Sequence, residues 1–311
     1  MKSIRAISLF LVIVMLFSVL LASCGGAEAG RYNDAKALYE AGKYEEAQTA
    51  FEAIKDYEDS KDWIKKCKTA ILDGMYNDAI AKLDAGNIIE AYEALIALDG
   101  HKDSADKAAS IADQYKAAKL KNAKAGDIIT FGRYEQDNDP DNGVEDIEWI
   151  VLEVKDGKAL LVSKFILDYY KFGAAWANSV MRTWLNTTFY EAAFDTEERN
   201  VISESVLKQE QSDKYSVYPG VNTDVNVFVL SADEAEVYFE NNKKCEMTPF
   251  SKSQSAQPNA ETNYGEWWLR SLHSNQKYHY LVNENGGVVS SGVYGRIEKG
   301  VRPAMWIEIG A

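Results

Sequence analysis

Oxygen-bearing side chains gather in one short stretch, from Asp137 to Glu148, at a spacing that could hold a cation. They stand at positions 1, 3, 5, 9 and 12 of the stretch, namely at Asp137, Asp139, Asp141, Glu145 and Glu148. Ca²⁺ takes about six to eight oxygen ligands, and an EF-hand loop supplies them at such positions. However, Asn142 replaces the usual glycine, and the flanking residues have strand patterns. Two interpretations stay open, a calcium site and a solvated acidic loop.

Paired aromatic residues and two arginines mark the last part of the chain. They lie in strand patterns or near turns, and the candidates for ligand binding are Trp267, Trp268, Arg270, Tyr278, Tyr280, Tyr294 and Arg302. Exposed aromatic rings can hold sugar rings through flat apolar contact. The alternative is structural, with the rings in the core and each guanidinium stacked on an indole and paired with a carboxylate. A ligand-binding role predicts an exposed aromatic face near residues 267–270.

The chain has none of the familiar catalytic motifs. Its sequence contains no GxSxG, no GxxxxGK[ST], no HExxH and no GxGxxG. His273 and His279 are isolated, and nothing selects two of the many acidic residues as the pair that a glycosidase needs. We therefore predict no catalytic residue and no cofactor other than the calcium ion already considered.

The first residues have the pattern of an export signal. Lys2 and Arg5 precede an apolar run from Ile7 to Leu21 that is short for a membrane span. The run closes with Leu21-Ala22-Ser23-Cys24, which resembles the bacterial lipobox. The resemblance implies cleavage before Cys24 and a lipid on its sulfur, and thus a protein anchored in the cell membrane at its extracytoplasmic face. An ordinary signal peptide is the alternative.

The charge balance excludes several partners. The chain has 48 acidic and 34 basic residues and a formal net charge of −14. Cleavage of residues 1–23 would remove Lys2 and Arg5 and no acidic residue, which leaves a net charge of −16. This surplus of negative charge argues against nucleic acid and against anionic lipid headgroups as partners. The lipid on Cys24, rather than basic patches, would hold the protein at the membrane. No pair of the three cysteines has metal-ligand spacing.

An internal repeat of 44 residues follows a short tether. Tyr32-Asn33-Asp34-Ala35 returns as Tyr76-Asn77-Asp78-Ala79. The pattern predicts five antiparallel helices over residues 31–121, with left-handed helix ends at Gly42 and Gly86 and N-caps at Asp59 and Asp103. The LYEAGKYEEAQTAF segment resembles a tetratricopeptide helix pair, although the period exceeds the usual ~34 residues. Such a region could bind an envelope protein or serve only as a spacer, and two units favour the spacer.

From residue 124 the helical pattern gives way to strands. We expect strands at 127–132, 147–154, 158–164 and 224–230, a hairpin turn at Lys155-Asp156-Gly157, and helices at 179–194, from Thr196, and at 231–239 with a capping box of Ser231 and Glu234. Residues 245–263 are polar and predict an exposed loop. The fold class is α+β, a helical repeat followed by a mixed, mostly antiparallel domain. The predicted segments are 1–23 signal peptide, 24–30 tether, 31–123 repeats and 124–311 ligand-binding-like domain.

The C-terminal domain resembles a known family. FGRYEQDNDPDNGVEDIEWIVLEV, MRTWLNTTFYEAAFDTEE, VFVLSADEAEVYF, WWLRS and GVRPAMWI follow one another across residues 127–307 and resemble the bacterial domain-of-unknown-function family numbered 6273. That family carries no established activity. The domain is more loosely similar to C-type-lectin-like folds and to the formylglycine-generating enzyme family. Cys245 alone does not supply the reactive thiols which that chemistry needs. Gln257-Pro258-Asn259 matches a lectin tripeptide without its usual partner.

These observations favour one function over two others. The leading hypothesis is a non-catalytic surface lipoprotein that binds an extracellular ligand, best a carbohydrate, through its C-terminal domain. The first alternative is an envelope scaffold that binds proteins through its helical repeats. The second is an unrecognised extracellular hydrolase, which would need two carboxylates converging in a cleft.

Overall fold

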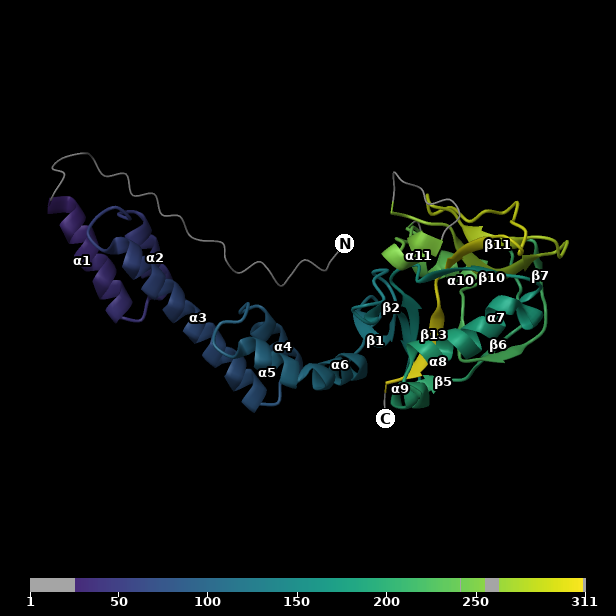
Figure 1. Cartoon of the computed structure of the whole chain (residues 1–311), viewed down its shortest axis with the longest axis horizontal. Helices are drawn as coiled ribbons and strands as arrows, with labels where there is room; N and C mark the ends of the chain where they lie inside the picture. The colour runs from purple at the N-terminus through teal and green to yellow at the C-terminus, as the bar shows by residue number, and fades with distance from the viewer. Residues whose placement is uncertain (1–25, 241, 255–262, 310–311) are drawn as a thin grey trace. The chain divides into compact units, whose positions relative to one another are not determined.

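The computed structural model describes residues 26–240, 242–254 and 263–309 (Figure 1). Two compact units divide the chain between Ala109 and Ser110. A helical region over residues 26–121 precedes a mixed, mostly antiparallel α+β domain, which confirms the predicted fold class. Within the described residues, no helix combines the length and the apolar character that crossing a bilayer requires. The predicted signal peptide, Cys24 and the Gln257-Pro258-Asn259 tripeptide lie outside the described residues.

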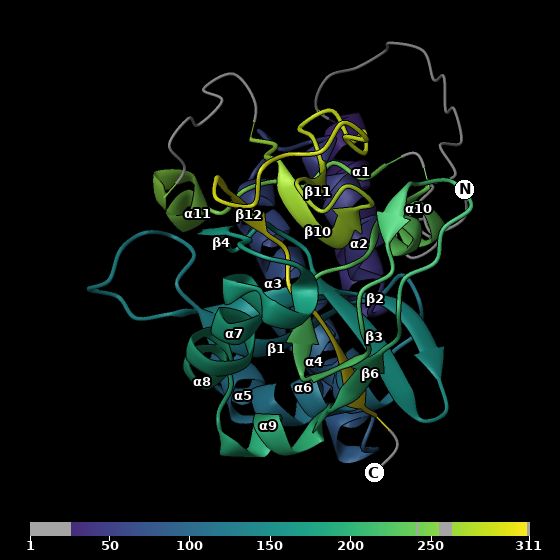
Figure 2. The ribbon, with the colours of Figure 1, turned by 90° about the vertical axis from the view of Figure 1, so that its right-hand side faces the viewer.

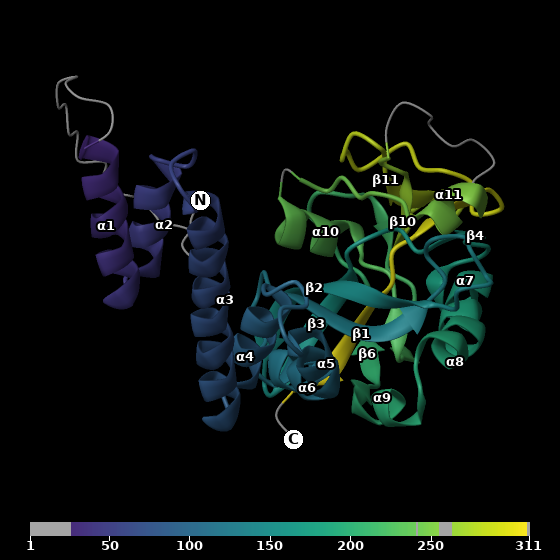
Figure 3. The ribbon, with the colours of Figure 1, turned by 60° about the vertical axis from the view of Figure 1, so that its left-hand side comes forward.

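One long helix links the two repeats of the helical region. α3 packs against α2 on one side and α4 on the other, so it serves as the last helix of the first repeat and the first helix of the second (Figure 3). Five helices were predicted over 31–121; the described residues form six, because the last one breaks at Ile111. The helices are α1 (Gly26–Glu40), α2 (Tyr44–Glu52), α3 (Ser60–Asp84), α4 (Ile88–Ile96), α5 (Ser104–Ser110) and α6 (Ala112–Lys121).

The two repeats share a tyrosine–aspartate contact that the sequence pattern did not predict. Asp59 stands at the N-cap position of α3 but makes no side-chain cap hydrogen bond. Instead the Tyr32 hydroxyl donates a hydrogen bond to its carboxylate, and Tyr76 does the same to Asp103. The predicted N-cap position of Asp59 is therefore confirmed, but its carboxylate binds Tyr32 rather than the backbone of α3. The predicted left-handed ends at Gly42 and Gly86 are confirmed by φ angles of 76° and 77°.

The second unit contains two larger sheets and a small one. The first sheet has the order β1-β2-β3-β13-β5, with β9 also paired to β13, and all of its pairs are antiparallel. The second has the order β11-β10-β12-β4, with β7 also paired to β10; only β10 and β12 run parallel. The strands are β1 (Ile128–Tyr134), β2 (Glu145–Lys155), β3 (Lys158–Ser163), β4 (Asp168–Lys171), β5 (Ile202–Ser203), β6 (Ser205–Leu207), β7 (Val217–Tyr218), β8 (Thr223–Val225), β9 (Val227–Phe228), β10 (Trp267–His273), β11 (His279–Val282), β12 (Glu298–Val301) and β13 (Ala304–Glu308).

Local signals set the turns and helix starts of this unit as predicted. Asp156 and Gly157, both at positive φ, form the two-residue turn between β2 and β3. Ser231 caps α10, and the Glu234 side chain returns to the Ser231 backbone to complete the capping box. The helices are η1 (Trp176–Asn178), α7 (Val180–Trp184), η2 (Leu185–Phe189), α8 (Tyr190–Ala193), α9 (Thr196–Val201), α10 (Ala232–Phe239) and α11 (Pro249–Gln254). In each view, β10 and β11 lie at the end of the unit opposite α9 (Figure 2).

Two predicted segments differ from the structure. The loop expected over 245–263 contains α11, because Pro249 suits a first helical position and the Thr248 hydroxyl accepts a hydrogen bond from the Ser251 N–H. The strand expected at 224–230 is split into β8 and β9. The Asn186 side-chain oxygen accepts hydrogen bonds from the N–H groups of residues 226 and 227 and so replaces the ladder at the break.

Candidate binding site

A small open pocket lies where four separate segments of the second unit meet. Its volume is about 120 Å³, below the ~300–1,000 Å³ of sites for drug-sized ligands, so it has room for one ring rather than for a chain. η1, the segment after β6, the segment after β7, and β10 supply its walls. The residues that line it are Ala175, Trp176, Ala177, Asn178, Leu207, Lys208, Glu210, Tyr218, Pro219, Gly220, Val221, Thr223, Arg270 and Leu272.

One arginine and two glutamates form a charged cluster at the pocket, which Arg270 and Glu210 line. The side chains of Arg270, Glu210 and Glu234 are 8%, 14% and 32% exposed. The Arg270 guanidinium makes a bidentate pair with Glu234, with Nη1–Oε2 and Nη2–Oε1 distances of 2.5 and 2.6 Å. Its Nε lies 3.4 Å from Oε1 of Glu210, and Nη1 also donates to the Val229 carbonyl. Arg270 is only 7% exposed, so this pairing is what permits its charge in the interior.

The two glutamates of this cluster differ in their proton affinity. Burial raises the pKa of Glu210, and the attraction of Arg270 offsets only part of that rise. Burial also acts to raise the pKa of Glu234, but its two bonds to Arg270 outweigh burial and leave the pKa below its ordinary value. Glu210 is the one carboxylate among the described residues that line the pocket. When both glutamates are ionised, the cluster has a net charge of −1. Its Glu210 carboxylate lines the pocket and can accept a hydrogen bond.

Hydrogen bonds fix the part of the pocket wall that η1 and β8 supply. The Trp176 indole N–H donates to the Thr223 hydroxyl over 3.1 Å, which joins η1 to β8. Arg182, in α7, donates to the carbonyls of Ala177 and Asp224 at 3.2 and 3.1 Å and ties the same two segments together. The wall is therefore held in place without a ligand, and a ligand would lose little affinity to ordering it.

The structure buries five of the seven predicted ligand-binding residues, and Arg270 alone among these five lines the pocket. Trp267 and Trp268 are fully buried, and Tyr280 and Arg302 are 1% and 2% exposed. The indole N–H groups donate to the carbonyls of Lys243 and Tyr170, which are core hydrogen bonds. The exposed aromatic face predicted near 267–270 is therefore absent from the described residues, and its tryptophans belong to the core.

The arginines confirm the structural alternative only in part. Arg270 is paired with carboxylates and also lines the pocket. Arg302 stacks on Phe239 and Trp267, with its guanidinium carbon 4.3 and 5.1 Å from the two ring centroids, and its Nε donates to the Ser163 carbonyl. It has no carboxylate partner among the described residues, and burial lowers its pKa. Arg302 thus contacts two aromatic rings and a backbone carbonyl in place of the predicted carboxylate partner.

The other two predicted residues lie together on the surface. The Tyr278 and Tyr294 ring centroids are 4.7 Å apart and their hydroxyls 3.2 Å apart. Tyr294 is 43% exposed and Tyr278 is half-buried. The predicted set of seven therefore separates into a buried core group, a pocket residue and a surface pair.

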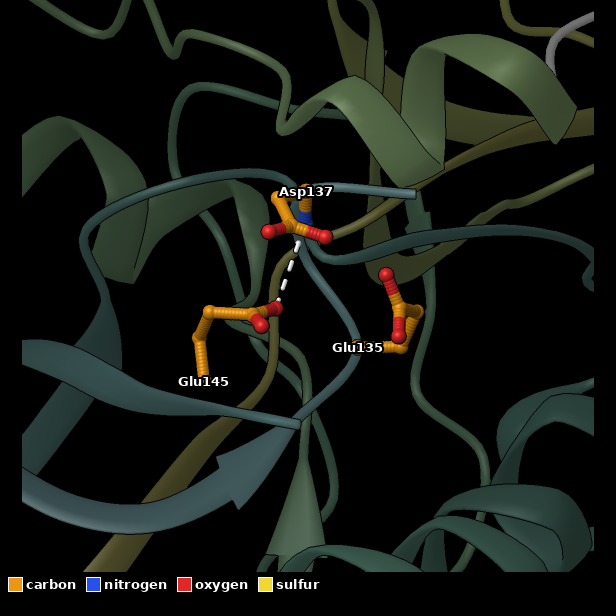
Figure 4. A group of neighbouring side chains, drawn as sticks. All are labelled: Glu135, Asp137 and Glu145. Carbon is orange, nitrogen blue, oxygen red and sulfur yellow. Dashed lines mark hydrogen bonds between the residues drawn. The ribbon is translucent and has the colours of Figure 1, made fainter. Parts of the chain in front are cut away.

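The acidic loop gathers only two of its five predicted ligands. Carboxylate oxygens of Asp137 and Glu145 lie within 4.8 Å of each other and of Glu135, which was not predicted (Figure 4). Glu148 instead pairs with Lys164 at 2.8 Å. Asp139 and Asp141 lie outside the group, where the Asp139 carboxylate accepts the Asp141 N–H.

Each carboxylate of this group already has a role in the loop. Glu145 accepts the N–H groups of Gln136 and Asp137 at 2.7 and 3.2 Å. The Glu135 carboxylate accepts a hydrogen bond from the backbone N–H of Asn138 at 2.6 Å. The two oxygens of Asp137 accept hydrogen bonds from the Asp139 backbone N–H and the Asn142 side-chain amide. Three carboxylates suit a hard cation, but backbone and side-chain N–H groups occupy most of their oxygens. Of the two interpretations, this geometry favours the solvated acidic loop over the calcium site.

We expect excess EDTA to leave the melting temperature of the protein unchanged, because N–H donors already satisfy the carboxylates of this loop. Differential scanning fluorimetry of the purified chain, with EDTA and with added Ca²⁺, checks this. An Asp137→Asn variant is the control for binding at the loop. A calcium-dependent rise in melting temperature that this variant abolishes would contradict the expectation and establish the predicted cation site.

Sequence reasoning missed most of the pocket. Glu234 was predicted only as a capping residue, and Trp176, Glu210 and Tyr218 were not singled out. The pocket needs segments that are far apart in the sequence, and none of them carries a local motif for binding. Burial of Glu210 depends on Arg270, 60 residues later, so only the folded chain brings the cluster together.

Comparison with known proteins identifies the domain but not its activity. No curated protein and no solved structure matches the chain. Residues 156–309 match the family described as "Domain of unknown function (DUF6273)", a range that begins after β2 and contains the whole pocket. The segment before it, residues 127–155, also resembled the family in sequence but lies outside the match. The C-terminal unit of this chain therefore carries a DUF6273 domain over residues 156–309.

Proposed function

We propose that the protein is a non-catalytic surface lipoprotein whose C-terminal domain binds the end of an extracellular carbohydrate in the pocket. The observation that carries this proposal is the cluster of Arg270, Glu210 and Glu234 at a pocket whose walls include Trp176 and Tyr218. The partly exposed Tyr218 ring offers flat apolar surface to the C–H face of a sugar, and Trp176, 8% exposed, adds a small part of it. Glu210 and Asn178 offer hydrogen-bond partners to its hydroxyls.

The charge of the site selects against anionic ligands. Glu210 and Glu234 together exceed the single charge of Arg270, and Glu234 occupies the guanidinium edge that could otherwise hold a carboxylate or phosphate in bidentate fashion. Lys208, at the pocket wall, is exposed and therefore hydrated. A neutral polyhydroxyl ligand fits this pattern of donors and acceptors better than an acid does.

The same arrangement supports binding rather than hydrolysis. Glycosidases use two carboxyl groups on either side of the scissile bond, about 5–10 Å apart. Among the described residues that line the pocket, Glu210 is the sole carboxylate, and it is engaged by Arg270. Glu234 is bonded to the guanidinium and lies outside the lining, so the described lining offers no second carboxylate for this role.

The lipobox at Cys24 supports a position at the extracytoplasmic face of the cell membrane, and the helical region then serves as a spacer. In residues 26–109, the exposed large apolar side chains are Met75 and Ile96. Two isolated residues are too few for an apolar protein-binding face, because surfaces that bind partners are usually contiguous patches. This favours the spacer over the envelope scaffold.

Loss of pocket side chains should weaken binding to carbohydrate. We expect Tyr218→Ala and Asn178→Ala each to reduce affinity roughly fivefold, since a stacked ring or a hydrogen bond contributes about 1 kcal/mol. The measurement is isothermal titration calorimetry of the full chain with the neutral polysaccharides xylan, mixed-linkage β-glucan and mannan, after a screen to find which of them binds.

Val237→Ala is the matched control, because Val237 is 71% exposed on α10 and does not line the pocket. It should bind as the unmodified chain does. Binding that survives both pocket substitutions would place the ligand elsewhere. Absence of binding across the whole panel, with a cooperative thermal transition showing intact folding, would overturn the carbohydrate proposal.

A further inference from the structure

A groove on the second unit is lined mainly by acidic and apolar side chains. Its volume is about 810 Å³, in the upper part of the ~300–1,000 Å³ range of sites for drug-sized ligands, and all of its lining residues belong to the unit that begins at Ser110. α6, β1, the start of β2, and the segment from α8 through α9 supply the lining, and α6 and α8 each contact β1 (Figure 2). The groove shares no residue with the pocket of Arg270 and Glu210, so it is a separate candidate site.

The groove carries an excess of negative charge. Six of its lining residues are acidic and two are basic, which gives the lining a net charge of −4. The two basic residues already have a partner, because Lys116 and Arg133 bind the two carboxylate oxygens of Asp146 at 2.7 and 3.0 Å. They therefore do not neutralise the other five carboxylates of the lining.

Three of these five carboxylates are open to a ligand. Asp113, Glu191 and Glu197 are exposed, and the carboxylates of these three have no ion pair or hydrogen bond with any residue that the structure describes. The other two are engaged in the fold, as the N-cap and the capping-box glutamate of α9. A cationic ligand could thus pair with three carboxylates without displacing a partner from them.

Apolar side chains accompany these carboxylates in the lining. Val144 is 55% exposed, Ala117 and Ala192 are exposed, and Leu120 and Val201 are partly exposed. Lysine and arginine have a long apolar stem and a charged end, so one such side chain can cover apolar surface and still reach a carboxylate. A metal ion could do only the second. A basic peptide also brings apolar side chains of its own, which a simple polyamine lacks.

We infer that the groove binds a basic segment of a partner protein. Its lysine or arginine side chains pair with Asp113, Glu191 and Glu197, and its apolar side chains cover Val144. The net charge of −14 on the whole chain favours the encounter with such a segment. Because the ion pairs are exposed, binding weakens as the salt concentration rises. The inference does not depend on the carbohydrate proposal, since the two sites have no residue in common.

The test is fluorescence anisotropy of the full chain with a short labelled peptide in which lysine alternates with valine. The chain should bind this peptide and should not bind one in which glutamate replaces lysine. Asp113→Asn, Glu191→Gln and Glu197→Gln together should lower the affinity roughly tenfold, since one exposed ion pair changes it about twofold to threefold. Val144→Ser should lower it about threefold, because the valine of the peptide then loses its apolar contact.

The matched control removes three acidic charges elsewhere on the same unit. Asp156→Asn, Asp213→Asn and Glu284→Gln together change the net charge equally, and none of these residues lines the groove or the pocket. This variant should bind the peptide as the unmodified chain does, and an unchanged thermal transition checks the fold of each variant.

Three results would overturn the inference. The first is absence of peptide binding by the folded chain. The second is an equal loss of affinity in the two triple variants, which would mean that the overall charge, rather than the groove, attracts the peptide. The third is binding of spermine as tight as that of the peptide and equally sensitive to the groove substitutions, which would make the ligand a small polycation.

Discussion

Arg270→Met should destabilise the C-terminal unit by about 3–5 kcal/mol, the usual cost of breaking a buried ion pair from one side. The substitution leaves the carboxylates of Glu234 and Glu210, 32% and 14% exposed, without the guanidinium that pairs with them. Methionine fills similar volume, so the loss measures the stranded charges rather than a cavity. Six of the seven tryptophans lie in this unit, so urea unfolding followed by tryptophan fluorescence reports on it.

The control is the triple variant Arg270→Met, Glu234→Gln, Glu210→Gln. Neutral amides no longer leave charges buried, so most of the lost stability should return. Glutamine at position 234 can also keep the capping-box bond to the Ser231 N–H. If the single substitution costs less than about 1 kcal/mol, or the triple variant is no more stable than the single one, the cluster does not stabilise the fold as argued.

The local elements of the domain could be predicted because short-range chemistry sets them. A Ser-x-x-Glu capping box and an Asp-Gly turn act within a few residues, and both are present where the sequence indicated them. Splitting of the predicted strand at 224–230 could not be foreseen in this way. Its cause is the amide of Asn186, some 40 residues earlier in the chain.

The sequence left the tryptophans open between an exposed and a core position for a different reason. Alternation in a strand assigns side chains to two faces, but it shows which face is exposed only when one of them meets water. In β10 every residue from Trp267 to Leu272 is buried, so both faces are covered and the alternation carries no information on exposure. The exposed ring contact lies at Tyr278 and Tyr294 instead, where backbone pairing across the turn brings the two tyrosines together.

His279 makes the stability of the domain depend on pH. Its ring is 2% exposed, lies 4.0 Å from Phe172 between ring centroids, and bonds the Gly173 carbonyl through Nε2 at 3.2 Å. Nδ1 has no partner among the described residues. Burial lowers the pKa of His279 from 6.5 to about 4, because a charged ring would lose its hydration there.

The sign of the effect follows from which state takes up the proton. Between pH 6.5 and about 4 the unfolded chain binds a proton at this histidine and the folded chain does not, so acidification favours unfolding. The stability is complete above pH 6.5 and is lost progressively as the pH falls to about 4. A difference of this size corresponds to about 3 kcal/mol.

We therefore expect His279→Phe to make the protein less sensitive to acid than the unmodified chain. Urea midpoints at pH values above 6.5 and near 4 should show that the difference in free energy of unfolding between the two proteins shifts by about 3 kcal/mol in favour of the variant at the lower pH. The same substitution at His273 is the control, since its ring is partly exposed and lies outside this buried environment. A pH dependence equal in both proteins would mean that the fold relaxes around a protonated His279. In that case the contacts with Phe172 and Gly173 would not hold the ring in its neutral form.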